Sequence, residues 1–229
     1  VYQIVDSALH WADSGAVPSP QLVVESRAAE PLPGQLIDAT LALLSERGLP
    51  GVTLRGVAKR AGVSHAAPFK HFASFADLLT ETAATGFELL GERVDEAGAA
   101  LPPGAGSRAR LVAASKAYVE TALDHPALFM LMFRFDLLDR ANARYAAASM
   151  SAYRQFLRYV RAVQDEGWHT DADTAVVNAT VWSLVHGIAT LWSEGALAAS
   201  VQDLASLDEI IDRSLEMVIG PSSPTGPRA

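Results

Sequence analysis

The chain lacks cysteine and is poor in charged residues. With no cysteine among its 229 residues, disulfide scaffolds, thiolate zinc sites, iron–sulfur clusters and cysteine nucleophiles are all excluded. Only 19% of the residues are charged and 50% are apolar, a balance typical of chains that bury a core and do not stay disordered. The net charge of −8 argues against a surface that attracts polyanions everywhere, but a local basic patch is still compatible with it. The composition predicts a soluble intracellular protein of one or two domains.

Signals for export or membrane insertion are also missing. No Lys or Arg precedes Arg27, and the N-terminal residues contain no continuous apolar run, so we expect no signal peptide. The most apolar stretch covers 175–192, but polar side chains interrupt it, and acidic residues flank it where a spanning helix would carry Lys or Arg. Its hydrophobicity on nearly all sides is typical of a buried or dimer-forming helix. We therefore expect a cytoplasmic protein with no membrane partner.

Long runs rich in Ala, Leu, Glu and Arg, broken at Gly and Pro, predict an all-α fold. The expected helices cover residues 35–47, 54–61, 65–71, 75–98, 107–124, 126–134, 137–166, 171–195 and 205–219. We divide the chain into an N-terminal extension (1–32), a three-helix unit (33–80), a helical bundle (81–219) and a disordered tail (220–229).

The segment 34–80 has the pattern of a helix-turn-helix. Gly48 is suited to the left-handed position that ends the first helix, and Thr53 is a natural N-cap for the second. Gly62 supplies a residue with positive φ in the turn, and Ser64 caps the third helix. Two short helices joined by a glycine-containing turn are typical of a DNA-binding motif.

The local charge agrees with this interpretation. Five basic residues and three acidic ones give 34–80 a charge of +2, which leaves −10 on the remainder. A basic end on an acidic protein directs only that end toward phosphates. The alternative is an ordinary three-helix bundle with a solvated basic edge.

The run ATLALLSERGLPGVTLRGVAKRAGVSHAAPFKHFASFADLL resembles the N-terminal DNA-binding domain of the TetR/AcrR family of bacterial transcriptional regulators. Further along, HPALFMLMF (125–133) and WSLVHG (182–187) resemble the regulatory domain class named for its Trp-His-Gly signature. The resemblance extends from Gly34 to the last helix and leaves 1–32 outside. It implies an effector-responsive DNA-binding regulator, a repressor that a small, apolar ligand releases from its operator, working as a homodimer.

The resemblance also implies which residues contact DNA. Thr53 and Arg55 match phosphate-contacting positions, and the recognition helix supplies most of the others. The expected DNA-binding residues are Thr53, Arg55, Lys59, Ser64, His65, Ala66, Phe69, Lys70 and His71.

Three departures from the family pattern bear on DNA affinity. Phe69 stands where family members usually have Tyr, Phe75 where a Lys is common, and Gly56 where an acidic residue often completes the helix cap. We expect weaker contacts with the phosphate backbone of DNA, or DNA binding that depends strongly on Arg55, Lys59 and Lys70. The alternative function is a helical ligand-binding or interaction module that has lost tight DNA binding.

The second half of the chain is rich in aromatic residues at helical spacing, and the resemblance implies that some of them line an effector pocket. Taken singly, each is also explained as ordinary core; together with methionines they suit an adaptable apolar site. The candidates are Phe87, Leu90, Tyr118, Phe129, Met130, Phe133, Tyr153, Phe156, Trp182 and His186. Trp182 and His186 share a helix face, either as a polar sensor against an aromatic wall or as structural groups.

Surplus apolar surface on the last two long helices predicts a dimer interface. A two-fold pairing of these helices with those of a second copy gives a four-helix interface, and one recognition helix alone reads too few base pairs. The expected interface residues are Gly187, Leu207, Ile210, Ile211, Leu215 and Val218.

Motifs for catalysis are missing. None of the six histidines belongs to an HExxH sequence, and GxSxG, Walker and GxGxxG motifs do not occur. Asp124 and His125 imitate a dyad, but Pro126 makes a helix boundary the simpler explanation. We expect no enzyme activity, no catalytic residue, no cofactor and no metal.

Overall fold

The computed structural model describes residues 31–201 and 206–220, and within these ranges it contains helices and no β-strand, which confirms the predicted all-α fold. The expected tail beyond Gly220, and all but the last two residues of the expected N-terminal extension, lie outside the described residues. The elements are α1 (Leu32–Arg47), the 3₁₀ helix η1 (Leu49–Gly51), α2 (Leu54–Arg60), the 3₁₀ helix η2 (Pro68–Lys70), α3 (Phe75–Ala99), α4 (Ser107–Asp124), α5 (Pro126–Met132), α6 (Ala143–Asp165), α7 (Thr174–Ser193), α8 (Ala196–Ser200) and α9 (Leu207–Ile219).

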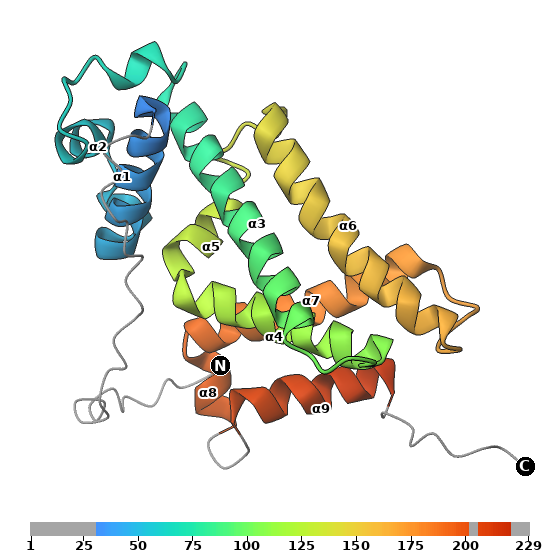
Figure 1. Ribbon diagram of the computed structural model, residues 1–229. Helices are drawn as coiled ribbons and strands as arrows, with labels where there is room; N and C mark the ends of the chain where they lie inside the picture. Colours follow the sequence, from blue (N-terminus) through green and yellow to red (C-terminus); the bar gives the residue numbers. More distant parts are fainter. Residues whose placement is uncertain (1–30, 202–205, 221–229) are drawn as a thin grey trace, which may run out of the picture.

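The first two helices have the ends that the sequence predicts. Gly48 ends α1 with φ of 64°, and the side chain of Thr53 accepts a hydrogen bond from the Gly56 N–H at 3.1 Å, which caps α2. Gly62 follows with φ of 70°, a conformation that favours glycine. This turn sets the direction of the chain that follows it (Figure 1).

The expected third helix over 65–71 is not a regular α-helix. After the turn at Gly62 the chain forms further turns and only the short 3₁₀ helix η2. Pro68 has no N–H to donate to the Ser64 carbonyl, so the first i→i−4 bond of the expected helix cannot form. The Ala67 N–H bonds to Ser64 instead at 3.0 Å, in an i→i−3 turn. We call residues 64–71 the recognition segment.

The longest helix, α3, connects the two ends of the molecule. The Ser74 hydroxyl accepts the Asp77 N–H at 3.1 Å, and the Asp77 carboxylate accepts the Ala73 N–H at 2.9 Å, so α3 begins at a reciprocal cap immediately after the recognition segment. The helix then passes through the centre of the bundle, in contact with α1, α4, α5 and α6 (Figure 1).

The remaining helices complete one continuous apolar core that extends from α1 to α9. The prediction that 137–142 is helical is wrong: α6 begins at Ala143, because the side chain of Asn142 caps it by accepting the Tyr145 N–H at 3.0 Å. Residues 133–142 form a loop, and the sequence did not predict α8. A capping box of Ser206 and Glu209 starts α9.

Helix α7 is long and apolar enough to cross a membrane by length and composition. In the structure it packs against α4, α6 and α9, with Val181 and Val185 fully buried. One side stays exposed, with Val176 and Leu191 at 64% and 46%. The helix is therefore part of the bundle, and one of its apolar faces is not covered by the other helices of the described structure.

Candidate DNA-binding surface and buried cavity

Every side chain predicted to contact DNA lies at the surface of the N-terminal end. Thr53, Arg55 and Lys59 are exposed on and before α2, and the six others are exposed on the recognition segment. The two groups lie on either side of the glycine turn and belong to the same end of the molecule (Figure 1).

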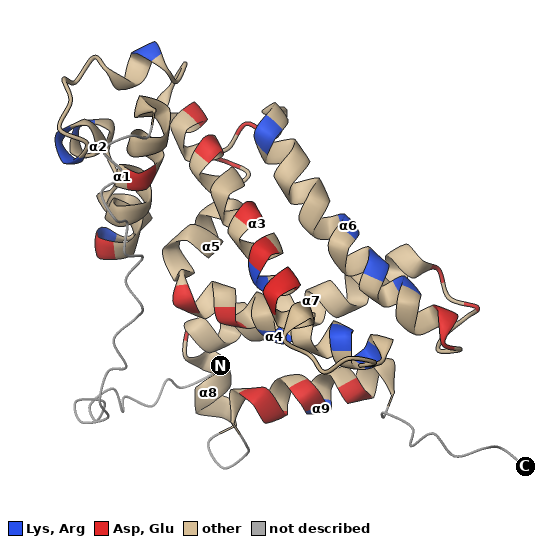
Figure 2. Cartoon of the chain, viewed as in Figure 1, with Lys and Arg blue, Asp and Glu red and all other residues tan. Residues whose placement is uncertain are grey.

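The basic residues of this end differ in their pairing. Arg60 is engaged by Glu46, with 2.6 Å between Nη1 and Oε2, and this hydrogen bond lowers the pKa of the Glu46 carboxyl. Within the described residues Arg55, Lys59 and Lys70 form no ion pair. These three charges are available to an anion, and Figure 2 shows basic residues on α2 and near η2.

Two of the three departures from the family pattern have different structural consequences. Phe69 is 61% exposed on the recognition segment, which is unusual for an aromatic ring. Phe75 is only partly exposed and packs against the core. The first ring is exposed to solvent, whereas the second packs at the start of α3.

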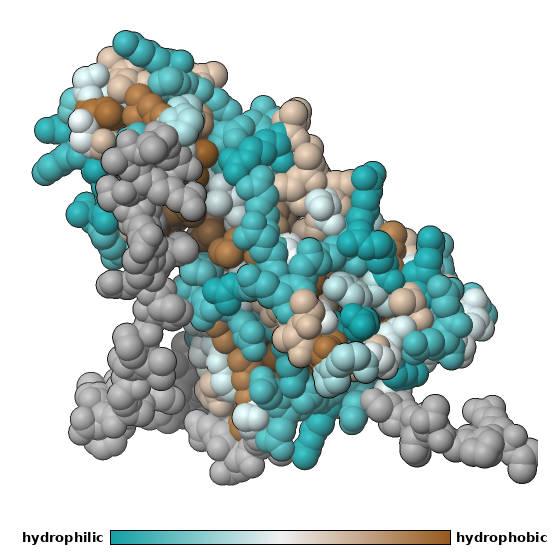
Figure 3. Space-filling model, viewed as in Figure 1, coloured by the Kyte–Doolittle hydropathy of each residue, from teal (hydrophilic) through white to brown (hydrophobic). Residues whose placement is uncertain are grey.

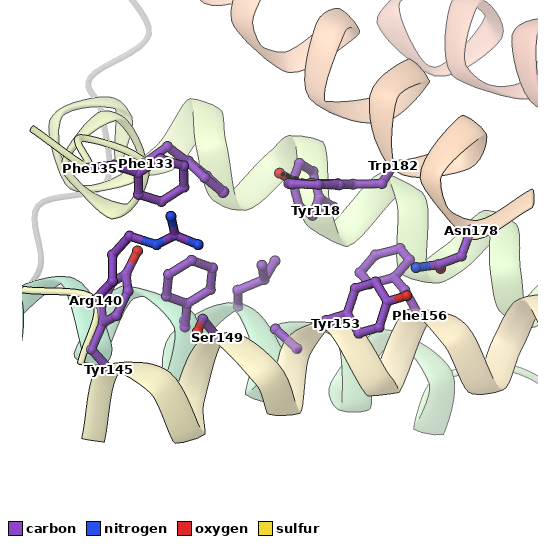
Figure 4. A pocket seen from close by; sticks show the side chains of 13 residues that line it. Tyr118, Phe133, Phe135, Arg140, Tyr145, Ser149, Tyr153, Phe156, Asn178 and Trp182 are labelled. Atoms are coloured by element: carbon purple, nitrogen blue, oxygen red, sulfur yellow. Dashed lines mark hydrogen bonds between the residues drawn. The ribbon is translucent and has the colours of Figure 1, made fainter. Parts of the chain in front are cut away.

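A cavity of about 180 Å³ lies between α3, α4, α6, α7 and the loop after α5 (Figure 4). It opens to the surface, where Phe135 and Trp182 are 51% and 41% exposed. Its lining is mostly aromatic, and the rings pack edge to face; the centroids of Phe87 and Tyr145, for example, are 5.6 Å apart. Most of the aromatic residues predicted for the ligand pocket line it: Phe87, Tyr118, Phe133, Tyr153, Phe156 and Trp182.

Three predicted pocket residues do not line the cavity. Met130 is 61% exposed, because it lies on the outer face of α5. Phe129 is buried behind Tyr118, with 5.5 Å between the ring centroids, and His186 lies behind Phe133 at 4.8 Å. Met130 therefore has no part in this cavity, whereas Phe129 and His186 pack against rings that line it.

Sequence reasoning missed several lining residues because they lie in the loop or carry polar groups. Arg140 and Phe135 come from the loop between α5 and α6, and Asn178 interrupts an otherwise apolar helix. The residues of the lining that were not predicted are Phe135, Arg140, Tyr145, Ser149, Ala152 and Asn178. Leu90, a candidate in the sequence, also lines it.

A hydrogen-bonded group of three aromatic side chains joins α4 to α7. The Trp182 indole N–H donates to the Tyr118 hydroxyl at 3.1 Å, and 2.8 Å separates that hydroxyl from Nδ1 of His186. The indole can only donate, so the Tyr118 hydroxyl accepts from it and keeps its own proton to donate. Donating that proton to Nδ1 uses every group of the three, and it corresponds to the His186 tautomer with its proton on Nε2. Burial lowers the pKa of His186 and raises the pKa of Tyr118, so both remain neutral.

A second, smaller cleft of about 70 Å³ lies where the bundle touches the N-terminal end. It is formed by Leu41, Leu44 and Ser45 of α1 together with residues 124–128. His125 is half-buried there, its Nε2 has no hydrogen-bond partner in the described structure, and burial lowers its pKa. Helix α5 therefore contacts α1 directly.

Part of the predicted dimer interface is wrong. Ile211 and Leu215 are 1% and 0% exposed, because the apolar stripe of α9 packs against α4 and α7 of its own subunit. Leu207, Ile210 and Val218 are half-buried, and a Cβ added at Gly187 would meet nothing within 4 Å. The exposed apolar groups of α7 and α9 include Val176, Leu191 and Met217, and Figure 3 shows apolar surface where α8 and α9 meet.

The chain matches known protein families over both halves. Residues 36–82 match "Bacterial regulatory proteins, tetR family", and residues 111–218 match "Tetracyclin repressor-like, C-terminal domain". No sequence among curated proteins matches the chain significantly.

Solved structures share the fold. A protein of unknown function from Rhodococcus sp. RHA1 is 30% identical, covering 85% of this chain and 96% of its own, with a TM-score of 0.72. The TetR family transcriptional regulator PfmR from Thermus thermophilus is 16% identical, with coverage of 82% and 99% and a TM-score of 0.60.

The transcriptional regulator FadR from Bacillus subtilis, solved in complex with stearoyl-CoA, is 14% identical, with coverage of 82% and 98% and a TM-score of 0.60. The likenesses to PfmR and FadR concern the fold. The two family matches, over the α-helices and glycine turn at one end of the molecule and over the helical bundle that follows, show the family: the chain belongs to the tetR family of bacterial regulatory proteins.

Proposed function

We propose that this DNA-binding transcriptional regulator is a cytoplasmic homodimeric repressor, released from its operator by a small ligand in the cavity. One observation carries the proposal. Helix α3 begins at Phe75, with only residues 72–74 between it and the recognition segment, and Phe87 and Leu90 of the same helix line the cavity. At 1.5 Å per residue, its 25 residues are about 37 Å long. A ligand that tilts α3 therefore moves the recognition segment.

The proposed DNA contacts follow from exposure and charge. Arg55, Lys59 and Lys70 are exposed and not ion-paired within the described structure, so they are suited to neutralise phosphates. His65 and Ala66 are exposed at the start of the recognition segment, where they are suited to read base edges.

We assign DNA binding to residues 33–80, and ligand binding and dimerisation to residues 81–219. Two structural relations support coupling between them. Helix α5 contacts α1, and Phe133, which follows the last residue of α5, lines the cavity. A Cβ on Gly86 of α3 would lie 2.7 Å from Met132 of α5, so α3 and α5 are in close contact. A ligand that displaces Phe133 thus acts on both helices.

Two finer assignments accompany this proposal. The hydrogen-bonded arrangement of Trp182 and His186 beside Gly187 supports the Trp-His-Gly class of regulatory domain. The exposed apolar face of α7 and α9 supports a two-fold dimer, because burial against the same face of a second copy removes it from water.

The experiment is a salt titration of binding between the full chain and the DNA upstream of its own gene. A regulator binds this DNA in preference to a scrambled sequence, with a steep negative slope of log K against log[salt]. Weak binding that ignores sequence would support the alternative, an interaction module without tight DNA binding, for which the missing hydroxyl at Phe69 is the specific reason.

A further inference from the structure

The cavity has a mostly aromatic wall with polar groups at both ends. The hydroxyls of Tyr118, Tyr145 and Ser149 are engaged by Trp182, the Met132 carbonyl and the Ala146 carbonyl. Arg140 and Asn178 lie at opposite ends. Figure 4 shows Arg140 near Phe133, Phe135 and Tyr145 at one end, and Asn178 near Trp182 at the other. Among the described residues of the lining, Arg140 carries the one charge and Asn178 has a buried oxygen without a hydrogen-bond partner, so these two groups bear most on which ligand chemistry fits.

Arg140 has a positive charge that the described part of the chain does not pair. Its guanidinium lies 4.9 Å from the ring centroid of Phe135 and points into the cavity in Figure 4. The neighbouring arginines are engaged: Arg144 by Glu81 and Glu88, and Arg134 by Asp136. An arginine held at the mouth by an aromatic ring and without a carboxylate partner is suited to bind an anion, above all a carboxylate.

Asn178 is the opposite kind of group, a neutral amide that is 2% exposed. Its Oδ1 is buried and has no hydrogen-bond partner, and its Nδ2 donates to no group of the described residues. A buried amide without partners is unfavourable unless something else supplies the hydrogen bond. A hydroxyl group does so in either orientation of the amide, because it both donates and accepts.

The size of the cavity limits the body of the ligand. Its volume of about 180 Å³ is close to that of an apolar cavity of roughly 150 Å³ that holds benzene. A single ring with a short side chain fills this space, whereas only part of a long acyl chain would lie inside it. Edge-to-face aromatic neighbours also favour a ring as the occupant.

We propose that the cavity binds a compact, single-ring aromatic acid, with its carboxylate at Arg140 and a hydroxyl group at Asn178. This inference rests on the proposed function only in taking the cavity as the effector site. It adds the chemical class of the effector and the two residues that select it.

The test measures binding of four probes to the full chain by calorimetry and by quenching of tryptophan fluorescence. The parent probe is 3-(4-hydroxyphenyl)propanoate. 4-Propylphenol lacks its carboxylate, 3-phenylpropanoate lacks its hydroxyl, and hexadecanoate is an acid without a ring. We expect the parent to bind best, with the loss of the carboxylate costing about tenfold or more and the loss of the hydroxyl about fivefold.

Variants assign each preference to its residue. Arg140→Gln should bind the parent and 4-propylphenol equally well, and Asn178→Leu should bind the parent and 3-phenylpropanoate equally well. Arg154→Gln, at an exposed arginine of α6 outside the cavity, is the matched control and should keep both preferences. Circular dichroism confirms that each variant is folded.

Equal binding of 4-propylphenol and the parent by the unmodified protein would overturn the carboxylate site, and tighter binding of hexadecanoate would overturn the compact ring. Binding of none of the probes would overturn the ligand class while leaving DNA binding untouched. If the parent binds with both preferences but does not weaken the DNA complex, the ligand class stands and the effector role fails.

Discussion

The two ends of the molecule present their functional side chains in opposite ways. At the N-terminal end all the predicted DNA-contacting residues are exposed, and the backbone that carries them is held by local caps and a glycine turn. In the bundle the functional side chains converge on a cavity from four helices and a loop. In the proposed function the exposed end works through charges near its surface and the bundle works through packing, so the two should respond to different perturbations.

The largest expected effect is on the exposed end. Replacing both Arg55 and Lys70 by Ala removes two proposed phosphate contacts from each subunit of a dimer. At roughly 1 kcal/mol for each contact, DNA affinity should fall on the order of a thousandfold, about equally on all sequences. The slope of log K against log[salt] should flatten by about one unit per contact in each subunit.

Arg60→Ala is the control, because Glu46 already engages this arginine, and it should change the slope little. A loss of discrimination between operator and random DNA with the slope unchanged would show that Arg55 and Lys70 read bases instead of phosphates.

The buried end should be sensitive to a single methyl group. In Gly86→Ala the new Cβ would lie 2.7 Å from Met132 and 3.2 Å from Leu128. Met132 is 1% exposed and has little room to move, so we expect the free energy of unfolding to fall by about 1–3 kcal/mol. Chemical denaturation measures this.

Gly91→Ala is the matched change on the same helix, where the nearest group to the new Cβ is Gln155 Oε1 at 3.7 Å. It should stabilise the protein by up to about 1 kcal/mol, because alanine is the better helix former. Equal effects of the two changes would mean that α3 and α5 are not tightly packed.

A substitution on the exposed ring should strengthen DNA binding. Phe69→Tyr adds a hydroxyl to a side chain that is 61% exposed on the recognition segment. A phosphate hydrogen bond has a net value of about 1 kcal/mol, or about fivefold per subunit. Electrophoretic mobility shifts with the upstream DNA measure the affinity of the variant. An unchanged affinity would mean that the ring does not face a phosphate.

The smallest expected effect is the pH dependence of stability. Burial lowers the pKa values of His125 and His186, whereas the unfolded chain binds a proton at these side chains near a pH of about 6.5. Below about that pH the unfolded state therefore holds more protons, and stability falls as the pH falls. Urea midpoints measured from about pH 7.5 to about pH 5.5 should decrease, and the decrease should be smaller in the double variant His125→Gln, His186→Gln. An equal decrease would contradict this cause.

The same contrast explains what the sequence could predict. Thr53 and Gly62 act through their own local geometry, so the helix ends and the turn were predictable. Pro68 also acts locally. Because it has no N–H to donate, the sequence already indicates that residues 65–71 do not form a regular α-helix. Arg140 and Asn178 have a role only because distant segments bring them to one cavity, and no periodicity reveals that. The apolar stripe of α9 shows the same limit, since a stripe does not say whether it packs in its own subunit or against another.

The most direct test of the central claim, that the cavity controls the placement of the recognition segments, is a distance between the two subunits. The chain has no cysteine, so Ala73→Cys, at an exposed residue that follows the recognition segment and is not a proposed DNA contact, offers one attachment site per subunit for a spin label. In the DNA complex the two labels should reflect half-sites roughly 34–36 Å apart. Adding 3-(4-hydroxyphenyl)propanoate to the free dimer should shift the distance away from this value and weaken DNA binding. If fluorescence shows that the probe is bound while the distance and the DNA affinity stay unchanged, the coupling through α3 and α5 is wrong.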